Sequence, residues 1–429
     1  MRTADRSASH ARCDSSRARG MANAEWLLLG GSILVSLALL ELFLRLWFPL
    51  FPSPYQPDDV LLVKLVPGAK KAFTRQAVNG GQRIVSQINS QGFRGEELRS
   101  LDHLKRVIVY GDSSVQAEFS DLAATFPKQL ESRLAPAFSA GVEVINAGVV
   151  GYGPDQISLR LPGDLETLKP ALVVVVIFAD NDFGDLIRNR IYRLNSQGDI
   201  ELSHYRLAPS WRANLQEAAH PRGLRRLQLE RYASRLWWIV RQLWSQAPLA
   251  PDEGYYSTYV EQSLQRSQIE FRHYLTDGAD VGYAEDPFAD PYDADIALQP
   301  DSLSARHKTA LMERVLIKLR DTTGRAATGL VLVILPSAVD VCDHYYFVNT
   351  RRYPQYDRGR LSRLVEDMAV RNGIPYLNLW HAFRAEDANL YYFHGGDDHW
   401  NDAGQAKAAQ LLADLIKQRQ LLDVPNRKP

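Results

Sequence analysis

Residues 171–178 read ALVVVVIF, and this unbroken apolar run decides the fold class. A short run rich in Val and Ile is typical of a strand in a parallel sheet that is buried on both faces. Strand-like and helix-like segments alternate on either side of it, which predicts an α/β fold: a three-layer α/β/α sandwich with a mainly parallel sheet. The other expected strands are 106–110, 142–146, 329–335 and 374–379, and the expected helices are 126–134, 154–168, 305–320, 361–371 and 402–418.

Polar or glycine-rich turns follow the three expected strands that come first along the chain, 106–110, 142–146 and 171–178. The turns are residues 111–114 (GDSS), 147–153 (AGVVGYG) and 180–182 (DND). Open α/β sheets bind their ligands outside the carboxyl ends of the strands. We therefore expect these three turns to meet at one edge of the sheet and to form a site there.

Candidate catalytic groups stand in the first turn and near the C-terminus. Ser113 is a candidate nucleophile, because a serine at the end of a strand projects its hydroxyl over the edge of the sheet. His399 precedes the last expected helix and stands beside Asp397 and Asp398. It is a candidate general base, with either carboxylate available to orient its imidazole. The alternatives are a plain turn at Ser113 and a surface loop at His399.

Two further residues are candidate donors to an oxyanion. Gly151 offers a backbone N–H and Asn181 a side-chain amide, and both follow strands. Otherwise Gly151 only makes a tight turn and Asn181 only caps a helix. A metal site on His394, Asp397 and His399 is a further alternative.

Taken together, these blocks resemble the SGNH (GDSL-type) hydrolase family. The resemblance covers about 88–185 and 303–420, and its four blocks stand in the family's order: 111–114, 146–151, 180–182 and 397–404. It implies Ser113 as nucleophile, His399 as base, and Gly151 and Asn181 as oxyanion donors. It also implies Asp397 as the acid of the triad, with Asp398 as the fallback. The sequence departs from the family's usual glycine or aspartate at Ala117, Ala179 and Gly396.

The resemblance also implies a function. Residues 89–95 (NSQGFRG) resemble the lead-in of membrane-anchored bacterial members, and the last block is similar to that of alginate O-acetyltransferase relatives. The implied activity is a serine esterase that acts on O-acyl groups, such as the acetyl esters of an extracytoplasmic polysaccharide, with no cofactor and no metal. An O-acetyltransferase of the same fold and a non-catalytic carbohydrate-binding or assembly protein are the alternatives.

Composition excludes several other classes of protein. Fifty Lys and Arg balance fifty Asp and Glu, so the basic surface that nucleic-acid binding needs is not indicated. The two cysteines, Cys13 and Cys342, are too few for a disulfide scaffold or a Cys-based metal site. The glycines of 148–153 are only weak evidence for nucleotide binding, because they lack the G-x-G-x-x-G spacing.

An apolar segment near the N-terminus predicts a membrane anchor. Trp26 to Leu44 contains a single charged residue, Glu41, and would span roughly 28 Å as a helix. A buried core helix is the alternative. Five arginines precede the segment, which places the N-terminus inside and the main body outside the cytoplasm, in the inner membrane of a bacterium. A start at Met21 would remove these arginines and leave the orientation open.

The expected organisation has seven parts. Between the two parts of the hydrolase domain, the insertion has an Arg-rich stretch (222–241) and an acidic one (277–301) with seven Asp, one Glu and no Lys or Arg. These stretches are expected to form a solvated surface and an acidic loop, or a cap over the ligand edge of the sheet. The parts are an N-terminal flank (1–25), the anchor (26–48), a linker and extended lead-in (49–104), the first hydrolase part (105–185), the insertion or cap (186–302), the second hydrolase part (303–420) and a tail (421–429).

Overall fold

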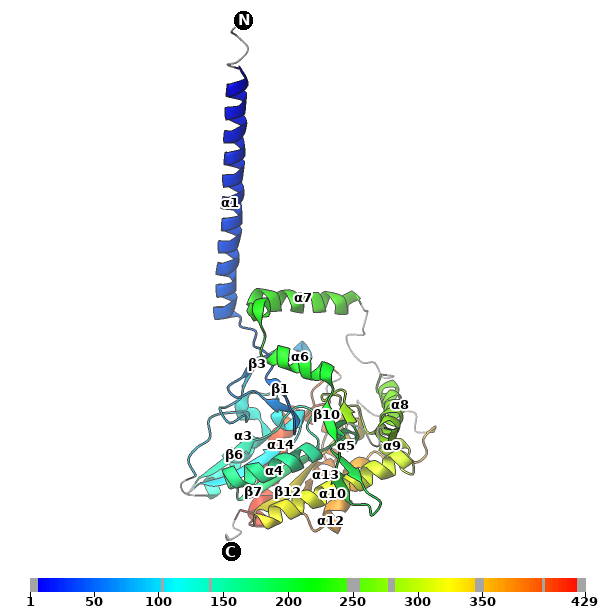
Figure 1. Ribbon diagram of the computed structural model, residues 1–429. Helices are drawn as coiled ribbons and strands as arrows, with labels where there is room; N and C mark the ends of the chain where they lie inside the picture. Colours follow the sequence, from blue (N-terminus) through cyan, green and yellow to red (C-terminus); the bar gives the residue numbers. More distant parts are fainter. Residues whose placement is uncertain are drawn as a thin grey trace. The chain divides into compact units, whose positions relative to one another are not determined.

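The computed structural model describes residues 7–101, 104–138, 141–244, 255–276, 282–343, 351–395 and 398–422. Its central sheet has five strands, and every neighbouring pair is parallel (Figure 1). The prediction of an α/β fold with a parallel sheet is therefore confirmed. The strands stand in the order β13 (Tyr376–Asn378), β12 (Gly329–Pro336), β7 (Leu172–Ala179), β5 (Lys105–Tyr110) and β6 (Val142–Asn146).

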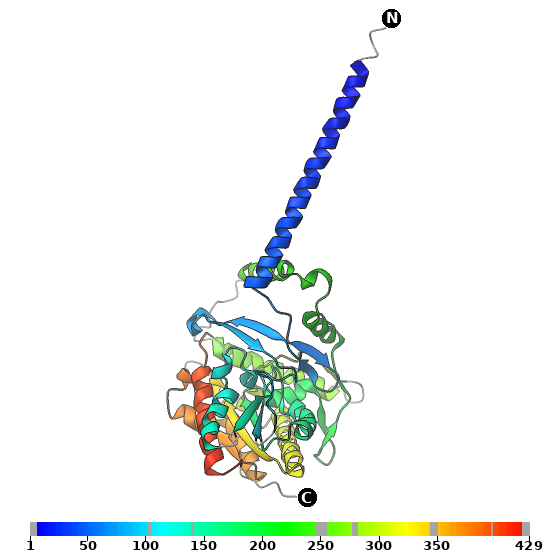
Figure 2. The same ribbon diagram turned by 90° about the vertical axis from the view of Figure 1, so that its left-hand side faces the viewer.

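Helices cover both faces of this sheet (Figure 2). Alternate residues of β7 enter two different apolar cores: Val173 and Val175 belong to one, and Val174 and Val176 to the other. All eight residues of β7 are buried, as a strand between two helical layers requires. The first core includes side chains of α4 (Pro154–Leu168), α5 (Asp182–Asn189), α10 (Leu303–Arg325) and α12 (Arg360–Arg371), and the second those of α3 (Phe126–Leu134), α13 (Leu379–Arg384) and α14 (Asp402–Gln418).

The strand order places a crevice beside β5. The chain runs from β5 outward to β6 on one side and then returns to β7 on the other side of β5. At such a reversal the loops after the two inner strands separate and leave room for a ligand at the carboxyl ends. Ser113 follows β5 and Asn181 follows β7, so both lie at this reversal.

The segment expected as a linker and lead-in forms two antiparallel hairpins. β1 (Tyr55–Asp58) pairs with β2 (Leu62–Leu65), and β3 (Lys70–Thr74) pairs with β4 (Arg83–Gln87). The first hairpin buries Leu62, Val63 and Leu65 in the same core as Tyr152, whose hydroxyl donates to the carbonyl of Val63 at 2.8 Å. This packing makes the hairpin part of the α/β unit.

The chain divides into two compact units. One comprises residues 1–50 and 221–247, and the other 51–220 and 248–429. The Arg-rich stretch therefore groups with the N-terminal helix, while the rest of the insertion groups with the α/β unit. The insertion contains β8 (Tyr192–Leu194), β9 (Ile200–Leu202), β10 (Tyr205–Leu207), α6 (Pro209–Ala219), α7 (Gln228–Trp244), α8 (Tyr255–Thr276), β11 (Gly282–Ala284) and α9 (Ala294–Leu298).

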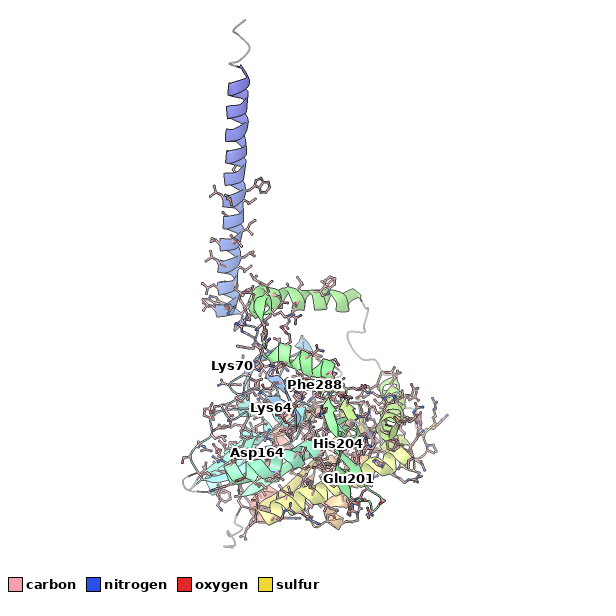
Figure 3. All side chains as sticks on the ribbon, viewed as in Figure 1. Lys64, Lys70, Asp164, Glu201, His204 and Phe288 are labelled. Atoms are coloured by element: carbon pink, nitrogen blue, oxygen red, sulfur yellow. The ribbon has the colours of Figure 1, made fainter. Side chains whose placement is uncertain are left out.

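The N-terminal helix α1 (Ser7–Trp47) carries the candidate membrane span. Its segment Glu25–Trp47 has a mean hydropathy of 2.3, and among the described residues it is the helix long and apolar enough to cross a bilayer. Side chains stand out to both sides of this segment in the view of Figure 3, and none of its most apolar window is buried. Burial is what a core helix requires, so the alternative of a core helix is wrong. As a helix, Glu25–Trp47 is about 34 Å long, which exceeds the ~30 Å thickness of the hydrocarbon core of a bilayer.

Candidate active site

Ser113 is the first residue of a short helix, α2 (Ser113–Gln116), that begins directly after β5. Gly111 makes the turn tight, because a Cβ there would lie 2.4 Å from the Cγ2 of Val115. Asp112 caps the helix, and its Oδ1 accepts the backbone N–H of Ser114 at 2.8 Å. The turn therefore places Ser113 at the carboxyl edge of the sheet.

The C-terminal end of α2 is held by residues from two other segments. Arg94 donates to the carbonyls of Gln116 and Ala117, and Asn146 donates to that of Val115 at 2.8 Å. The last carbonyls of a helix have no partner within it, so these donors fix an otherwise open end. Burial lowers the pKa of Arg94 to about 10. Sequence reasoning noted the segment 89–95 but did not assign this role to Arg94.

Ala117 occupies a left-handed conformation directly after α2. Its φ is 50°, and its N–H donates to the carbonyl of Ser113 at 2.7 Å. Glycine adopts this conformation at the least cost, which explains the glycine that the family often has here. In this chain an alanine adopts it.

His399 lies beside Ser113. Its Nε2 is 2.7 Å from the Oγ of Ser113, although 286 residues separate the two in sequence. Trp400 fixes this end of the loop: it is buried, and its indole N–H donates to the carbonyl of Ser114 at 2.8 Å. The ring of Phe119 meets the imidazole edge to face, with 5.0 Å between centroids.

Asp398 supplies a carboxylate on the other side of the imidazole. Its Oδ1 is 3.3 Å from the Nδ1 of His399, and the side chain is 30% exposed. Asp397, the acid that the family resemblance favours, lies outside the described residues. The fallback Asp398 is therefore the carboxylate with a described contact to His399.

Gly151 lies in the turn after β6. Its φ is 76°, and a Cβ at this position would lie 2.0 Å from the carbonyl oxygen of Pro287. Only glycine fits such a place. Gln116 ties this turn to α2, because its Oε1 accepts the N–H of Val150 at 2.8 Å. The turn of Gly151 and the helix of Ser113 are thus joined by a direct hydrogen bond.

Asn181 is the N-cap residue of α5, on the β7 side of Ser113. The residue is 4% exposed, and its Oδ1 has no hydrogen-bond partner among the described residues. Its two neighbours are buried carboxyls: Ser337 donates to Asp180, and the N–H of Phe178 donates to Asp182 at 2.8 Å. Burial raises the pKa of both carboxyls well above the ordinary value, and the charge of Asp398 adds to the effect at Asp180. Both carboxyls therefore hold a proton more readily than an exposed aspartic acid does.

Part of the acidic stretch is not solvated. Asp293 and Asp295 are buried, and their carboxylates lie 3.0 and 2.9 Å from the Nζ of Lys308, which is itself buried. Asp293 also joins this stretch to the candidate site: its N–H donates to the carbonyl of Asp180 at 2.6 Å, and its Oδ2 accepts the N–H of Gly184. The expectation of a solvated acidic loop is wrong for these two residues.

An aromatic contact secures the same stretch against the lead-in. Phe288, labelled in Figure 3, packs on Tyr55 with 5.2 Å between ring centroids and on Trp211 with 5.8 Å. Because Pro287 precedes it, this contact holds the carbonyl that lies over Gly151. The stretch therefore borders the candidate site at Gly151 and at Asp180.

Replacing Lys308 by methionine is expected to lower the free energy of unfolding by about 3–5 kcal/mol. The reason is that two buried carboxylates lose their cation. Burial alone would lower the pKa of Lys308, but the two carboxylates raise it, so the group is charged when folded. Urea unfolding in detergent micelles measures the loss. Arg320→Met on the same helix is the control, because Arg320 pairs with Asp321 at an exposed site. Equal losses in the two variants would contradict the assignment.

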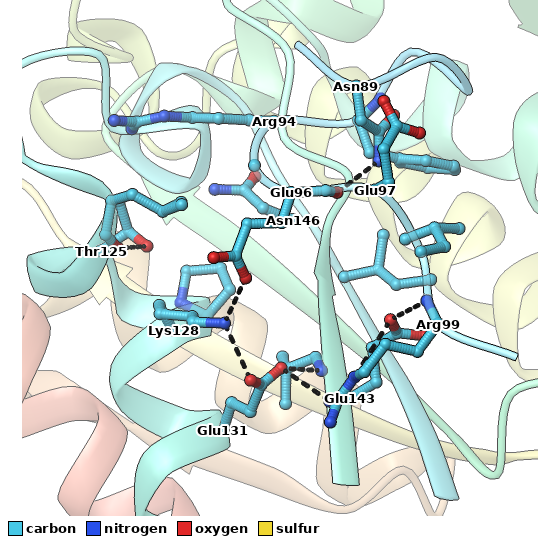
Figure 4. A pocket seen from close by; sticks show the side chains of 17 residues that line it. Asn89, Arg94, Glu96, Glu97, Arg99, Thr125, Lys128, Glu131, Glu143 and Asn146 are labelled. Carbon is cyan, nitrogen blue, oxygen red and sulfur yellow. Dashed lines mark hydrogen bonds and ion pairs between the residues drawn. The ribbon is translucent and has the colours of Figure 1, made fainter. Parts of the chain in front are cut away.

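A separate cavity of about 170 Å³ lies beneath the lead-in (Figure 4). Its lining includes none of Ser113, Gly151, Asn181 or His399. Its charges satisfy one another: Lys128 lies between Glu96 and Glu131, at 3.0 and 2.9 Å. Paired charges of this kind stabilise the junction of lead-in and sheet, so this cavity is not part of the candidate active site.

The described residues do not support a metal at the candidate site. No three His, Cys, Asp or Glu side chains among them are placed to hold an ion. His394 is exposed, and its backbone exchanges two hydrogen bonds with the side chain of Asn79. Asp397, the third member of that alternative, is outside the described residues.

Comparison with protein families identifies the second part of the fold. Residues 292–428 match the family model described as "SGNH hydrolase-like domain, acetyltransferase AlgX". The chain has an SGNH hydrolase-like α/β fold. This match confirms the resemblance drawn from the sequence, including its likeness to alginate acetyltransferase relatives. None of the curated proteins matches the chain.

Several solved esterases are similar to the chain at low sequence identity. An acetyl xylan esterase, AlAXEase, is 12% identical, with 72% of this chain and 99% of that chain covered and a TM-score of 0.35. A lipase/acylhydrolase from Enterococcus faecalis is 11% identical, with coverages of 73% and 96% and a TM-score of 0.33. A mutant of Axe2, an acetylxylan esterase from Geobacillus stearothermophilus, is 12% identical, with coverages of 72% and 93% and a TM-score of 0.34.

Proposed function

We propose that this protein is a membrane-anchored serine esterase or acyltransferase that acts on O-acetyl esters of a carbohydrate polymer. The observation that carries the proposal is the 2.7 Å between the Nε2 of His399 and the Oγ of Ser113. A hydroxyl and an imidazole at hydrogen-bond distance are the pair that nucleophilic acyl transfer needs. The SGNH hydrolase-like match supports a hydrolase or an acyltransferase.

The proposed reaction has two halves. Ser113 attacks the ester carbonyl through its Oγ, while the Nε2 of His399 takes the hydroxyl proton. The tetrahedral intermediate then loses the alcohol, which receives that proton, and an acetyl group remains on Ser113. A water or an acceptor hydroxyl repeats the sequence on the acetyl-enzyme, again with His399 as base. Water gives hydrolysis, and an acceptor hydroxyl gives acetyl transfer.

The oxyanion is assigned to donors on either side of Ser113. Gly151 follows β6 and Asn181 follows β7, and these strands flank β5. A backbone N–H and a side-chain amide from the two sides suit the charge that develops on the carbonyl oxygen. In this assignment the Nδ2 group of Asn181 donates to the oxyanion. The Oδ1 of the same amide has no hydrogen-bond partner among the described residues, so no contact to this oxygen opposes that orientation.

Asp398→Asn is expected to lower turnover by up to about 10⁴-fold. The carboxylate at the Nδ1 of His399 holds the tautomer that leaves Nε2 free to take a proton, and an amide does not. Initial rates on a short-chain aryl acetate measure the effect. Asp397→Asn is the matched control, one residue away, and should retain most of the activity. A larger loss in the Asp397 variant would restore the acid that the family resemblance favours.

The acetyl-enzyme is the species that tests the proposed chemistry. Wild-type protein is mixed with excess aryl acetate, quenched in acid and digested. The mass of the peptide that contains Ser113 is then measured by mass spectrometry. We expect one added acetyl group on that peptide. Adding oligosaccharide acceptors then separates the two activities: faster loss of the acetyl group with acetylated acceptor as product indicates a transferase. Steady hydrolysis without any acetylated peptide would contradict a serine intermediate.

The anchor is part of the proposal. The exposed apolar segment Glu25–Trp47 supports a single membrane span, and the arginines before it support a catalytic unit on the far side of the cytoplasmic membrane. Protease added to intact spheroplasts should then digest the catalytic unit. Protection of that unit from the protease would indicate the opposite orientation and contradict this part of the proposal.

A further inference from the structure

α7 is joined to the C-terminal end of α1 through its first turn. The carboxylate of Glu41 on α1 accepts the backbone N–H groups of Gln228 and Leu229, each at 2.9 Å. The first N–H groups of a helix have no partner within it, and negative charge is favourable there. Glu41 therefore caps α7 from a different helix.

Further hydrogen bonds fix this junction. The side chain of Gln228 exchanges two with the backbone of Leu50, at 2.8 and 3.0 Å. Arg231 also donates to the carbonyl of Leu50 at 2.5 Å, and the hydroxyl of Tyr232 donates to that of Phe48 at 2.8 Å. Both helices belong to one compact unit, and within it α7 runs across the axis of α1 (Figure 1). The crossing is thus held by several residues of both segments.

The two sides of α7 differ in character. At 100° per residue most of the apolar residues fall within one arc, while the opposite arc is polar apart from the position of Trp238. The apolar side is not packed away: Leu236 is 62% and Trp237 71% exposed. The apolar side consists of Leu229, Tyr232, Ala233, Leu236, Trp237 and Val240, and the polar side of Glu230, Arg231, Ser234 and Arg235.

The sequence around the start of α7 is strongly basic. Residues 221–237 contain one acidic residue, Glu230, and five arginines. Basic residues next to an apolar helix face favour a surface that carries anionic lipid headgroups. The arginines are Arg222, Arg225, Arg226, Arg231 and Arg235.

We propose that α7 lies flat in the interface of a bilayer that contains anionic phospholipid, with Leu236 and Trp237 in the lipid. The inference rests on the proposed membrane anchor. Glu41 stands six residues before the end of α1, so the start of α7 lies roughly 9 Å inside that end. Interfacial helices bury their apolar face by about 5–10 Å, and this depth agrees. The arrangement also accounts for a charged Glu41 within an apolar segment, since the carboxylate is paired there.

Spin labels on single cysteines of the full chain test this placement. The background is Cys13→Ser, in which the remaining Cys342 is buried and the unlabelled blank shows any residual reaction. A nitroxide is attached at Leu236→Cys, and at Ser234→Cys, which lies about 160° away around α7. The protein is reconstituted in vesicles of phosphatidylcholine and phosphatidylglycerol. Collision of each label with oxygen, which is enriched in lipid, and with a water-soluble nickel complex gives its depth.

Two reference positions make the outcomes distinguishable. Leu34→Cys lies in the middle of the apolar segment of α1, and Leu275→Cys is an exposed apolar site on α8 in the other unit. We expect the Leu34 and Leu236 labels to lose collision with nickel, the Leu236 label to be the shallower, and the Ser234 and Leu275 labels to remain in water. A Leu236 label that behaves like that at Leu275 would overturn the inference and leave the anchor intact.

The remaining outcomes also decide. A Leu34 label in water would show that the anchor itself fails, and the inference with it. A Leu236 label that is shielded from both oxygen and nickel would show a protein partner on this face, such as a second copy of the chain, and would overturn the lipid assignment. In vesicles of phosphatidylcholine alone, we expect the Leu236 label to regain collision with nickel while that at Leu34 does not. An unchanged depth there would contradict the role given to the arginines.

Discussion

Ser113→Ala is expected to reduce hydrolysis of a short-chain aryl acetate by about 10⁶-fold. The variant loses the oxygen that lies 2.7 Å from the Nε2 of His399, and with it the acetyl-enzyme. The rate that remains should exceed that of water alone by roughly 10³–10⁴, because binding and oxyanion stabilisation persist. Initial rates at saturating substrate measure the change.

Ser114→Ala is the matched control for this prediction. Ser114 is buried, and its Oγ has no hydrogen-bond partner among the described residues. The backbone groups of Ser114 make the contacts that shape the turn, and alanine keeps them. The variant should therefore retain most of the activity. A loss in Ser114→Ala as large as that in Ser113→Ala would show that the turn, and not the hydroxyl of Ser113, was disturbed.

His399→Ala is expected to cost about as much as Ser113→Ala, near 10⁶-fold in turnover. Without the imidazole, neither the hydroxyl proton nor the proton of the leaving alcohol has a carrier. Residues that act as one unit are strongly non-additive, so the double variant Ser113→Ala/His399→Ala should be no slower than either single variant. Rates on the same aryl acetate provide the comparison.

The opposite result would be additive losses. If the double variant were slower than each single one by the product of their effects, Ser113 and His399 would contribute independently. The far-ultraviolet circular dichroism of each variant checks that it is folded. Additivity with intact folding would remove the pair from the mechanism.

The sequence predicted the sheet well where strands are fully buried. Residues 142–146 and the helix 154–168 were predicted with the observed ends, since apolar runs and a proline at the first helical turn mark them. The last strand was predicted as 374–379 but is shorter, Tyr376–Asn378. The side chain of Asn378 accepts the N–H of Trp380 and starts a helix there. A local cap of this kind competes with a strand in a short apolar run.

The insertion was the part that sequence patterns did not resolve. Its acidic stretch reads as a solvated loop, yet Asp293 and Asp295 are buried against Lys308 of a later helix. This ion pairing depends on which helix packs beside the acidic stretch, and the hydrophobic periodicity of the sequence does not reveal that. The same holds for Glu41, whose role as a cap depends on a helix nearly two hundred residues away.

The motifs predicted the candidate catalytic residues but not the residues that hold them in place. Ser113 and His399 stand in blocks that resemble a family, so the pair could be proposed from the sequence. Arg94 holds the end of α2, a role that its place in the segment 89–95 does not reveal. The choice between Asp397 and Asp398 rests on loop geometry, which sequence spacing leaves open by one residue.

Labelling with a serine-directed fluorophosphonate tests the central claim most directly. The full-length protein in detergent is treated with the probe and digested, and the modified peptide is sequenced by mass spectrometry. The account predicts one adduct per chain, on Ser113, that disappears in Ser113→Ala and persists in Ser114→Ala. A folded wild-type protein that takes up no probe, or takes it up at another residue, would contradict a serine nucleophile at this site.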